Sequence, residues 1–411
     1  MSGLEIFGTE GLPRVAPARA ARNGRPLDIV IFGLSITSSW GNGHATNYRA
    51  LVRALDARGH RVLFLEWDAP WYRGHRDLRR PAGGDLCLYR SLDELQERHW
   101  ERVRGADAVI VGSFVRDGVD LGHWVNDVAE GTTIFYDIDT PITLAKLEAG
   151  DFEYLEPSLV RRYDLYLSFT GGPVLRALER RYGSAAARAF YCMVDPDEYR
   201  PARTGLRWDL AYLGTYSADR QPALARMLLD PARRLANARM CVAGPGYPDR
   251  LGWPANVERI EHVAPPEHPA FYNRQRFTLN LTRDRMARAG WSPSVRLFEA
   301  AACGVPVISD VWEGLDHFFQ PGEEILVAES ADDVVRALRD TSPEAARAIG
   351  RRARRRVLGW HTAGHRAREL EQHLREARTR RRAADRPTGA PSAEALRPRL
   401  AEIPYLGPSF R

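Results

Sequence analysis

The stretch Gly290–Asp310, GWSPSVRLFEAAACGVPVISD, decides the fold of this chain because it predicts a helix followed at once by a buried strand. Ser292 is a good N-cap, and Pro293 suits the first helical position, where its missing N–H costs no hydrogen bond. Gly304 ends the helix, and the apolar, β-branched run after it is typical of a strand buried on both faces. The stretch therefore predicts one unit of a parallel α/β sheet.

The start of this predicted helix carries groups that suit an anion. Arg296 and Glu299 lie three residues apart, so both side chains share one helix face near its positive end. This helix start predicts a diphosphate site, built from backbone N–H groups, Ser292, Ser294 and Arg296. Glu299 is placed to accept hydrogen bonds from a ribose diol. The alternative is an ordinary α/β unit in which Arg296 and Glu299 pair with each other.

The same alternation of strand and helix runs through the rest of the chain and predicts doubly wound, parallel sheets. In the first half the expected strands are 27–33, 61–67, 106–113, 132–139 and 164–170, with a helix at about 45–57. In the second half strands are expected within LAYLGTYSADRQPAL, ARMCVAGPGYP, VERIEHV, RFTLNLT, VPVIS and EILVA. A chain of 411 residues exceeds the usual size of one core, so two domains are expected.

The region from Asn280 to about Leu370 resembles the C-terminal half of GT-B glycosyltransferases, within the glycosyl transferases group 1 and closest to its spore-maturation, CgeB-like branch. The resemblance lies in NLTRDRMARAGWSPSVRLFEAAACGVPVISDVWEGLDHFF, in PGEEILVAES and in the arginine-rich helix ending in HTAGHRAREL. It implies a hexosyltransferase-type enzyme that takes a sugar from a nucleotide-activated donor. It also implies an α/β GT-B fold, in which two Rossmann-like domains face an interdomain cleft.

Domain boundaries follow from this resemblance and from the strand pattern. We expect a flexible segment at 1–26, an acceptor domain at 27–205, a nucleotide-sugar donor domain at 206–365, and a helix crossing back with a tail at 366–411. In folds of this kind ligands bind at the carboxyl ends of the strands, so the loops of both domains are expected to meet at the cleft.

Two further loops complete the predicted donor site. In GTYSADR, Gly214 follows a strand and lets the backbone approach a phosphate closely. The resemblance puts Arg220 where related families carry a lysine, as a diphosphate clamp, with Thr215 or Tyr216 donating hydroxyls. For Arg220 a solvent-facing place at a helix start is the alternative. Arg283, at another strand end, is placed to neutralise charge on the departing nucleoside diphosphate.

One position departs from the resemblance. Many retaining GT-B enzymes carry two glutamates eight positions apart, and Glu299 matches the second of them. Trp291 stands at the first position, where an indole cannot do the work of a carboxylate. The resemblance therefore leaves both stereochemical outcomes open. It also leaves open a non-catalytic nucleotide- or sugar-binding protein of a spore or surface layer, and a nucleotide-sugar epimerase.

Candidates for the acceptor side lie in the first half. The loop SSWGNGH is glycine-rich and precedes a helix, so Trp40, Gly41, Asn42 and Gly43 are the expected acceptor-binding residues. The aromatic-rich segment Glu66–His75 follows the next strand. Its aromatic rings could stack on a sugar or on a planar acceptor, and plain packing is the alternative.

Three residues are candidate catalytic bases. His44 begins a helix, whose positive end favours the neutral imidazole that a base requires, although a bond to the backbone is the alternative. Asp137 and Asp139 close a strand and, two residues apart, are expected on the same side of it. Either could deprotonate an acceptor hydroxyl, orient sugar hydroxyls or cap the next helix. Their spacing imitates the DxD metal motif of the GT-A fold, but no metal is predicted, because they lie far from the donor loops.

Composition limits the partners. The net charge is +6, but Lys146 is the single lysine, which indicates arginine-rich genome composition rather than selection for nucleic acid. A basic surface still suits peripheral contact with an anionic membrane. No apolar run is long enough for a transmembrane helix, no signal-peptide core is present, and the four cysteines have no paired spacing, which predicts a cytoplasmic protein. The expected partners are a UDP-, GDP- or dTDP-linked sugar, used as a substrate rather than a cofactor, and an unidentified acceptor.

Overall fold

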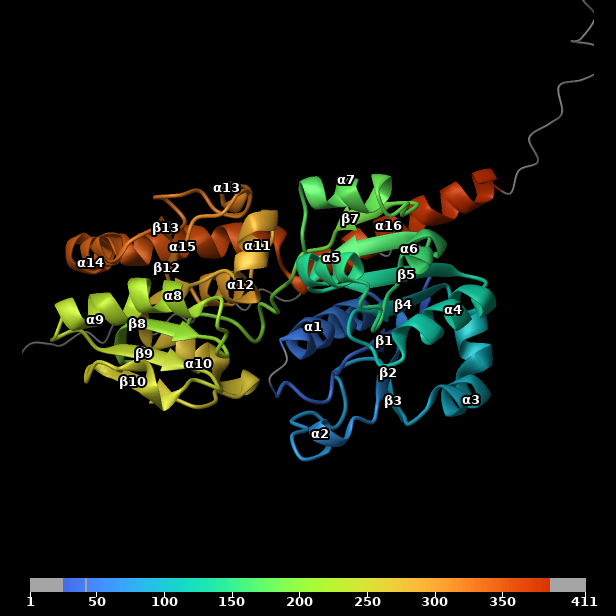
Figure 1. The fold of residues 1–411 in the computed structure, drawn as a ribbon, viewed down its shortest axis with the longest axis horizontal. Coiled ribbons are helices and arrows are strands. Elements are labelled where there is room, and N and C mark those ends of the chain that lie inside the picture. The colour runs from blue at the N-terminus through green and yellow to red at the C-terminus, as the bar shows by residue number, and fades with distance from the viewer. Residues whose placement is uncertain (1–24, 41–42, 385–411) are drawn as a thin grey trace, which may run out of the picture.

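The computed structural model describes residues 25–40 and 43–384, which form two α/β domains lying side by side (Figure 1). The expected flexible segment 1–26 lies outside the described residues except for its last two positions, and so does the expected tail after residue 384. Gly41 and Asn42, two of the expected acceptor-binding residues, also lie outside them.

The N-terminal domain contains a sheet of seven parallel strands in the order β3-β2-β1-β4-β5-β6-β7. This order reverses between β1 and β4, which is the switch point at which Rossmann-like folds bind ligands. The strands are β1 Asp28–Gly33, β2 Arg61–Trp67, β3 Asp85–Tyr89, β4 Ala108–Gly112, β5 Thr132–Asp137, β6 Leu165–Ser168 and β7 Ala187–Ala189.

Helices cover both faces of this sheet, and alternate side chains of β1 show why the strands are so apolar. Ile29 and Ile31 enter one core, whereas Val30 and Phe32 enter the core on the other face. A strand buried on both faces reads as a continuous apolar run. The helices are α1 His44–Ala57, α2 Pro70–Arg73, α3 Leu92–Gly105, α4 Gly118–Val128, α5 Thr140–Ala149, α6 Pro157–Arg162 and α7 Pro173–Arg180.

The C-terminal domain repeats the same topology with six parallel strands in the order β10-β9-β8-β11-β12-β13. They are β8 Trp208–Leu213, β9 Met240–Ala243, β10 Val257–Ile260, β11 Gln275–Asn280, β12 Val307–Ser309 and β13 Leu326–Val327. The helices are α8 Gln221–Leu224, α9 Asp230–Arg234, α10 His268–Asn273, α11 Asp284–Ala289, α12 Val295–Ala302, α13 Leu315–Phe318, α14 Ala331–Asp340 and α15 Pro343–Trp360. The two switch points, β1/β4 and β8/β11, face the cleft between the domains.

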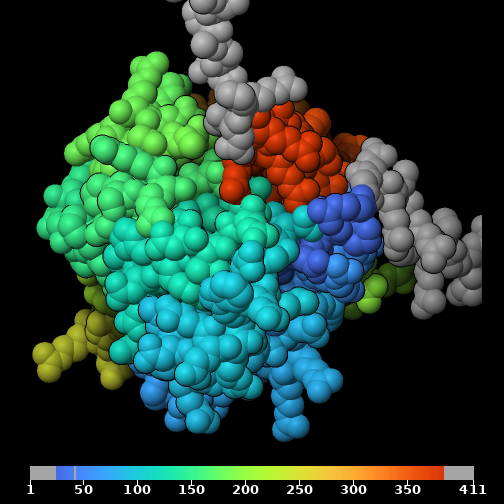
Figure 2. Space-filling view, turned by 90° about the vertical axis from the view of Figure 1, so that its right-hand side faces the viewer, coloured from blue at the N-terminus to red at the C-terminus, as the bar shows by residue number. Residues whose placement is uncertain are grey.

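The last helix, α16 (Ala363–Ala384), returns to the N-terminal domain (Figures 1 and 2). Its Glu371 accepts a hydrogen bond from Arg58 Nε at 2.5 Å and lies 2.8 Å from His60 Nε2, both in the turn between α1 and β2. Further along, Arg378 donates to Asp107 Oδ1 at 2.8 Å. These contacts tie α16 to the N-terminal domain, so the two domains are connected by more than one crossing of the backbone.

The predicted strands are present, but the start of the decisive helix is not where the sequence predicts it. α12 begins at Val295 with Ser294 as its N-cap, two residues later than expected. The Ser292 hydroxyl lies 2.9 Å from Thr170 Oγ1, and the N–H of Trp291 donates to Glu313 O at 2.7 Å. Tertiary contacts thus hold residues 291 and 292 outside the helix, and the prediction of Ser292 as the N-cap was wrong.

Candidate active site

Two adjoining cavities lie in the cleft between the domains, at the carboxyl ends of both sheets. Cavity 1 has a volume of about 550 Å³, and cavity 2 a volume of about 220 Å³. Both are lined by residues of both domains, and they share Gly43, Ser294 and Val295. The N-terminus of α12 therefore lies at the junction of the cavities, where its partial positive charge favours an anion.

Arg296 forms part of the wall of cavity 2 and is held rigidly there. Its Nε donates to Leu213 O at 2.6 Å, one terminal nitrogen donates to Asn280 Oδ1 at 2.9 Å, and its guanidinium lies over the Tyr212 ring at 4.7 Å. The same Asn280 oxygen accepts a hydrogen bond from the Ser294 hydroxyl at 3.0 Å. These contacts fix the guanidinium of Arg296. The alternative in which Arg296 pairs with Glu299 is therefore not what the structure shows.

Glu299 also lines cavity 2, and its side chain is almost completely buried. Its Oε2 accepts a hydrogen bond from Tyr272 Oη at 2.8 Å and lies 4.0 Å from His268 Nδ1. Burial lowers the pKa of His268, with the Glu299 charge opposing this shift. A carboxylate held in this way is a preorganised hydrogen-bond acceptor at the wall of the cavity.

The glycine loop after β8 is shaped to bring backbone close to this cavity. A Cβ at Gly214 would lie 2.6 Å from Tyr212 Oη and 2.9 Å from an Arg296 nitrogen, so a larger residue would displace the arginine. Gly214 and Thr215 line cavity 2. Tyr216 lines neither cavity; its ring packs against Tyr247 at 5.5 Å between centroids.

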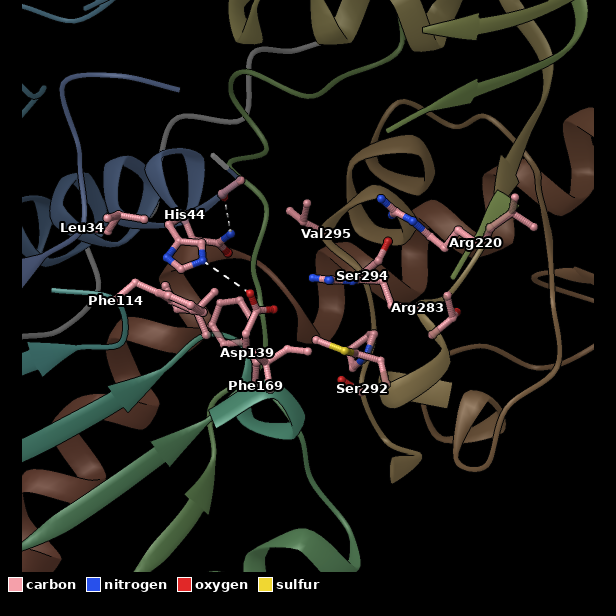
Figure 3. Close-up of a pocket in the computed structure, with 18 of the residues that line it drawn as sticks. Leu34, His44, Phe114, Asp139, Phe169, Arg220, Arg283, Ser292, Ser294 and Val295 are labelled. Atoms are coloured by element: carbon pink, nitrogen blue, oxygen red, sulfur yellow. Dashed lines mark hydrogen bonds and ion pairs between the residues drawn. The ribbon is translucent and has the colours of Figure 1, made fainter. Parts of the chain in front are cut away.

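Two arginines of the C-terminal domain, Arg220 and Arg283, line cavity 1 (Figure 3). One terminal nitrogen of Arg220 donates to Thr215 O at 2.7 Å, and Arg283 Nε lies 4.0 Å from Asp219 Oδ2. The Nε atoms of both arginines are buried and find no hydrogen-bond partner within the described residues. Two such guanidinium groups in one cavity suit a multiply charged anion.

His44 and Asp139 line the same cavity from the N-terminal domain, opposite the arginines (Figure 3). His44 Nε2 lies 3.8 Å from Asp139 Oδ2, and the Asp139 side chain is 28% exposed. Burial raises the pKa of Asp139, but the hydrogen bond and charge of His44, with Arg283 and Arg220, outweigh it and hold the pKa below its ordinary value. The carboxylate is therefore ionised at neutral pH.

Asp137 lies elsewhere. It is completely buried, accepts hydrogen bonds from Tyr166 Oη at 2.5 Å and Thr143 Oγ1 at 2.8 Å, and lines neither cavity. The expectation that Asp137 and Asp139 share one side of a strand was wrong, because β5 ends at Asp137 and Asp139 belongs to the turn before α5. Asp137 instead accepts the N–H of Asp139 at 3.2 Å and so supports that turn.

Asp137 gives a prediction for stability against pH. Burial raises its pKa to about 6 from an ordinary 3.8, so the folded protein binds more protons than the unfolded chain between these values. The free energy of unfolding should therefore fall by about 3 kcal/mol from this group as pH rises from about 4 to 6. In Asp137→Asn this loss is absent, so the melting temperature of the variant relative to wild type should rise between pH 4.5 and pH 7. A pH-independent difference would contradict this prediction.

The expected acceptor loop reaches across the cleft. The Trp40 ring, 40% exposed, stacks on His75 at 4.4 Å between centroids and lies 5.1 Å from His262 of the C-terminal domain. Gly43 lines both cavities. Trp40 lines neither cavity, but His262 lines cavity 2, so the tryptophan contacts the edge of that cavity.

Sequence reasoning missed Glu66, which shapes this loop. Glu66 is completely buried, and its Oε2 accepts the backbone N–H groups of Ile36 at 2.7 Å and Thr37 at 3.0 Å. Its Oε1 accepts hydrogen bonds from the Ser35 and Thr37 hydroxyls. The sequence did carry a signal for this role, because Glu66 stands alone within the apolar run RVLFLEW. A polar side chain buried in such a strand requires hydrogen-bond partners.

Trp291 packs at the junction of the domains rather than presenting a polar group. A Cβ at Gly172 of the N-terminal domain or at Gly314 would lie 2.5 to 2.6 Å from its ring. Its carbonyl accepts the N–H of Gly171 at 2.9 Å. The indole therefore fills the space between the two domains, beside cavity 1, where it positions the segment 292–295.

Comparison with known proteins identifies the fold. Residues 220–372 match a protein family described as glycosyl transferase-like. Sucrose-phosphate synthase from Thermosynechococcus elongatus is similar in structure, with a TM-score of 0.63 and 15% identity over 86% of this chain and 99% of that one. HepE from Anabaena, in complex with UDP and glucose, has a TM-score of 0.63 and 11% identity over 85% of this chain and 100% of that one.

AviGT4, a glycosyltransferase involved in avilamycin A biosynthesis, has a TM-score of 0.59 and 18% identity, over 86% of this chain and 98% of that one. No curated protein sequence matches the chain. The fold is therefore GT-B, with two Rossmann-like domains, as the sequence predicts. Among the helices that the structure describes, none has the length and apolar character needed to cross a bilayer.

Proposed function

We propose that this chain is a metal-independent glycosyltransferase of the hexosyltransferase type, which moves a sugar from a nucleoside diphosphate to an acceptor hydroxyl. One observation carries the proposal. Arg220 and Arg283 of one domain face the His44–Asp139 pair of the other across cavity 1, so that a cationic wall opposes an acid–base pair. The resemblance of the C-terminal half to the CgeB-like branch adds to this proposal.

The donor would bind across both cavities. The nucleoside fits cavity 2, where Glu299 accepts hydrogen bonds from the ribose diol and Arg296 forms the wall. The diphosphate then lies at the N-terminus of α12, beside Ser294, and the sugar enters cavity 1. HepE, one of the similar structures, was determined with UDP and with UDP-glucose, which makes UDP the first nucleotide to test.

The chemistry asked of each wall is simple. The His44–Asp139 pair accepts the proton of the acceptor hydroxyl as that oxygen bonds to the anomeric carbon. Arg220 and Arg283 stabilise the negative charge that builds up on the leaving nucleoside diphosphate. Two fixed cations and a helix N-terminus supply the positive charge that a divalent ion provides in other transferases. This is the physical basis for proposing that no metal is needed.

Nucleotide binding tests the donor site directly. At a concentration a hundred times its dissociation constant, the correct nucleotide among UDP, GDP, dTDP and CDP should add about 2.7 kcal/mol to the free energy of unfolding. Glu299→Gln keeps an oxygen for Tyr272 but loses the charge, and it should weaken nucleotide binding about ten- to a hundredfold. Thermal melting with each nucleotide measures both effects.

The matched control is Glu344→Gln, because Glu344 is an exposed carboxylate at the start of α15. This variant should bind nucleotide like wild type. Stabilisation by none of the four nucleotides would overturn the donor site. Release of nucleotide with formation of a new glycoside identifies a transferase, whereas binding without turnover identifies a non-catalytic protein.

A further inference from the structure

A third cavity, of about 280 Å³, adjoins cavity 1 on the side of the N-terminal domain. The two share Leu34 and Phe114, so the Phe114 ring stands between them. Cavity 3 opens at the ends of β1, β2 and β4, and it is lined further by Trp67, Trp71, Arg116, Asp117 and Glu153. None of these five residues has a role in the function proposed above.

The aromatic part of cavity 3 presents one free platform. The Trp67 indole donates to Arg90 O at 3.1 Å, and the Arg116 guanidinium already covers its ring at 4.4 Å. Trp71 meets Trp67 edge-on, with 5.3 Å between ring centroids, and is 57% exposed. A large apolar ring left exposed in a cavity is available to a ligand with an apolar face.

The charged side chains that line cavity 3 are all paired with groups of opposite sign. Arg116 Nε lies 3.4 Å from Asp117 Oδ2, and Glu153 Oε2 accepts a hydrogen bond from Lys146 Nζ at 2.7 Å. Lys146 Nζ also donates to Asp151 Oδ2 at 2.6 Å, so this one cation is shared by two carboxylates. The lining therefore has no excess of positive charge to attract an anion, and its paired side chains offer hydrogen bonds to hydroxyl groups. Aromatic platforms flanked by planar polar groups suit the faces and hydroxyls of a sugar ring.

The loop that joins cavities 1 and 3 is held in an unusual conformation. Phe114 and Asp117 both have positive φ, at 62° and 51°, although neither is glycine. The Phe114 ring contacts His44, with centroids 5.6 Å apart, and Tyr154, at 4.7 Å. Strained backbone of this kind persists where the surrounding contacts determine it, and it is common at binding sites. In this conformation Phe114 lines both cavity 1 and cavity 3.

We propose that cavity 3 binds the second sugar ring of a neutral oligosaccharide or glycoside acceptor, stacked on Trp71 and hydrogen-bonded by Arg116, Asp117 and Glu153. The inference rests on the proposed function, because the reacting ring must lie in cavity 1. There its hydroxyl oxygen bonds to the anomeric carbon of the donor sugar, and the bond from that carbon to the diphosphate oxygen breaks. The hydroxyl proton goes to the His44–Asp139 pair, and the nucleoside diphosphate leaves with the bonding electrons.

The test is the binding of fluorescently labelled full-length protein to a glycan array of neutral mono-, di- and trisaccharides. Wild type should bind a set of oligosaccharides and bind the corresponding monosaccharides at least tenfold more weakly. Trp71→Ala should lose at least tenfold in affinity for that set. Trp100→Ala is the matched control, since Trp100 is 41% exposed on α3 and is covered by Arg104 at 5.2 Å, and it should bind like wild type.

Equal binding by Trp71→Ala and wild type would overturn the proposal, as would binding of monosaccharides alone or binding of no glycan. Arg116→Gln gives a second reading, because it removes the charge beside Trp67 without touching Trp71, and it should also weaken glycan binding. Nucleotide-dependent melting of Trp71→Ala should match that of wild type. If no nucleotide binds either protein, the donor site fails on its own, while the array still decides the fate of cavity 3.

Discussion

Replacing Asp139 by asparagine is expected to lower kcat for sugar transfer by about two to four orders of magnitude, the usual contribution of an acid–base group. The reason is local. The carboxylate lies 3.8 Å from His44 Nε2, and it stabilises the imidazolium that forms when the acceptor proton is taken. Asparagine is nearly the same size but carries no charge. Nucleotide binding should be unchanged, because Asp139 lies in cavity 1 and not in cavity 2.

The matched control for this variant is Asp127→Asn, which changes an exposed carboxylate on α4. Asp127 lines neither cavity and does not support the turn that carries Asp139, so its variant should keep transfer activity while Asp139→Asn loses it. His44→Ala should cost about as much as Asp139→Asn, and the double variant little more, because groups that act as a unit are not additive. Steady-state kinetics with donor and acceptor varied separately measure these effects.

The pH profile adds a second check on Asp139. Because its pKa is held below the ordinary value, the carboxylate is ionised throughout the neutral range. The loss in Asp139→Asn should therefore be constant between pH 6 and pH 9. A loss that disappears within this range, or equal losses in the two aspartate variants, would mean that Asp139 does not form the catalytic pair.

The fold was predictable because its information is local. The central parallel strands are buried on both faces, so apolar runs such as VPVIS and LDIVIFG mark strands without help from tertiary structure. β3 and β7 were missed for physical reasons. β3 lies at the edge of its sheet with most of its residues only half-buried, and β7 has three residues, so neither gives a long apolar run.

The site was only partly predictable, because side chains are shared between distant segments. Ser292 reads as an N-cap, but its hydroxyl contacts Thr170 of the other domain. Asp137 and Asp139 read as equivalent until the end of β5 separates them. Cavity 3 depends on the meeting of the loops after β2 and β4, which no single stretch of sequence reveals. Contacts between segments that are distant in the sequence therefore decide which side chains reach the site, and a local sequence pattern does not contain them.

Trp291 shows how the site differs from the pattern it resembles. The ring fills the gap between Gly172 and Gly314, so no carboxylate reaches cavity 1 from this position. The groups that remain to act on the substrate are the His44–Asp139 pair on one side and the arginines on the other. In the proposed reaction the His44–Asp139 pair therefore accepts the acceptor proton, and Arg220 and Arg283 stabilise the leaving nucleoside diphosphate.

Replacing Arg220 or Arg283 by alanine is accordingly expected to lower kcat by about a hundred- to a thousandfold, the usual loss when one preorganised donor to a developing anion is removed. Both guanidinium groups line cavity 1, opposite the His44–Asp139 pair, so each can donate from the cavity wall to a phosphate oxygen of the leaving group. Lysine at either position should restore part of the rate, because it keeps the charge but not the planar fork of donors. Arg288→Ala, an exposed arginine on α11, should behave like wild type.

The same variants separate arginine from metal as the source of positive charge. If the two arginines carry the leaving-group charge, removal of divalent cations with EDTA should leave wild-type kcat unchanged within about twofold, and the double alanine variant should lose more than either single one. Wild-type activity that requires added Mg²⁺, with near-normal rates in both arginine variants, would contradict this assignment. Because Arg220 and Arg283 help to hold the pKa of Asp139 below its ordinary value, the arginine variants should move the acidic side of the pH profile of kcat to higher pH.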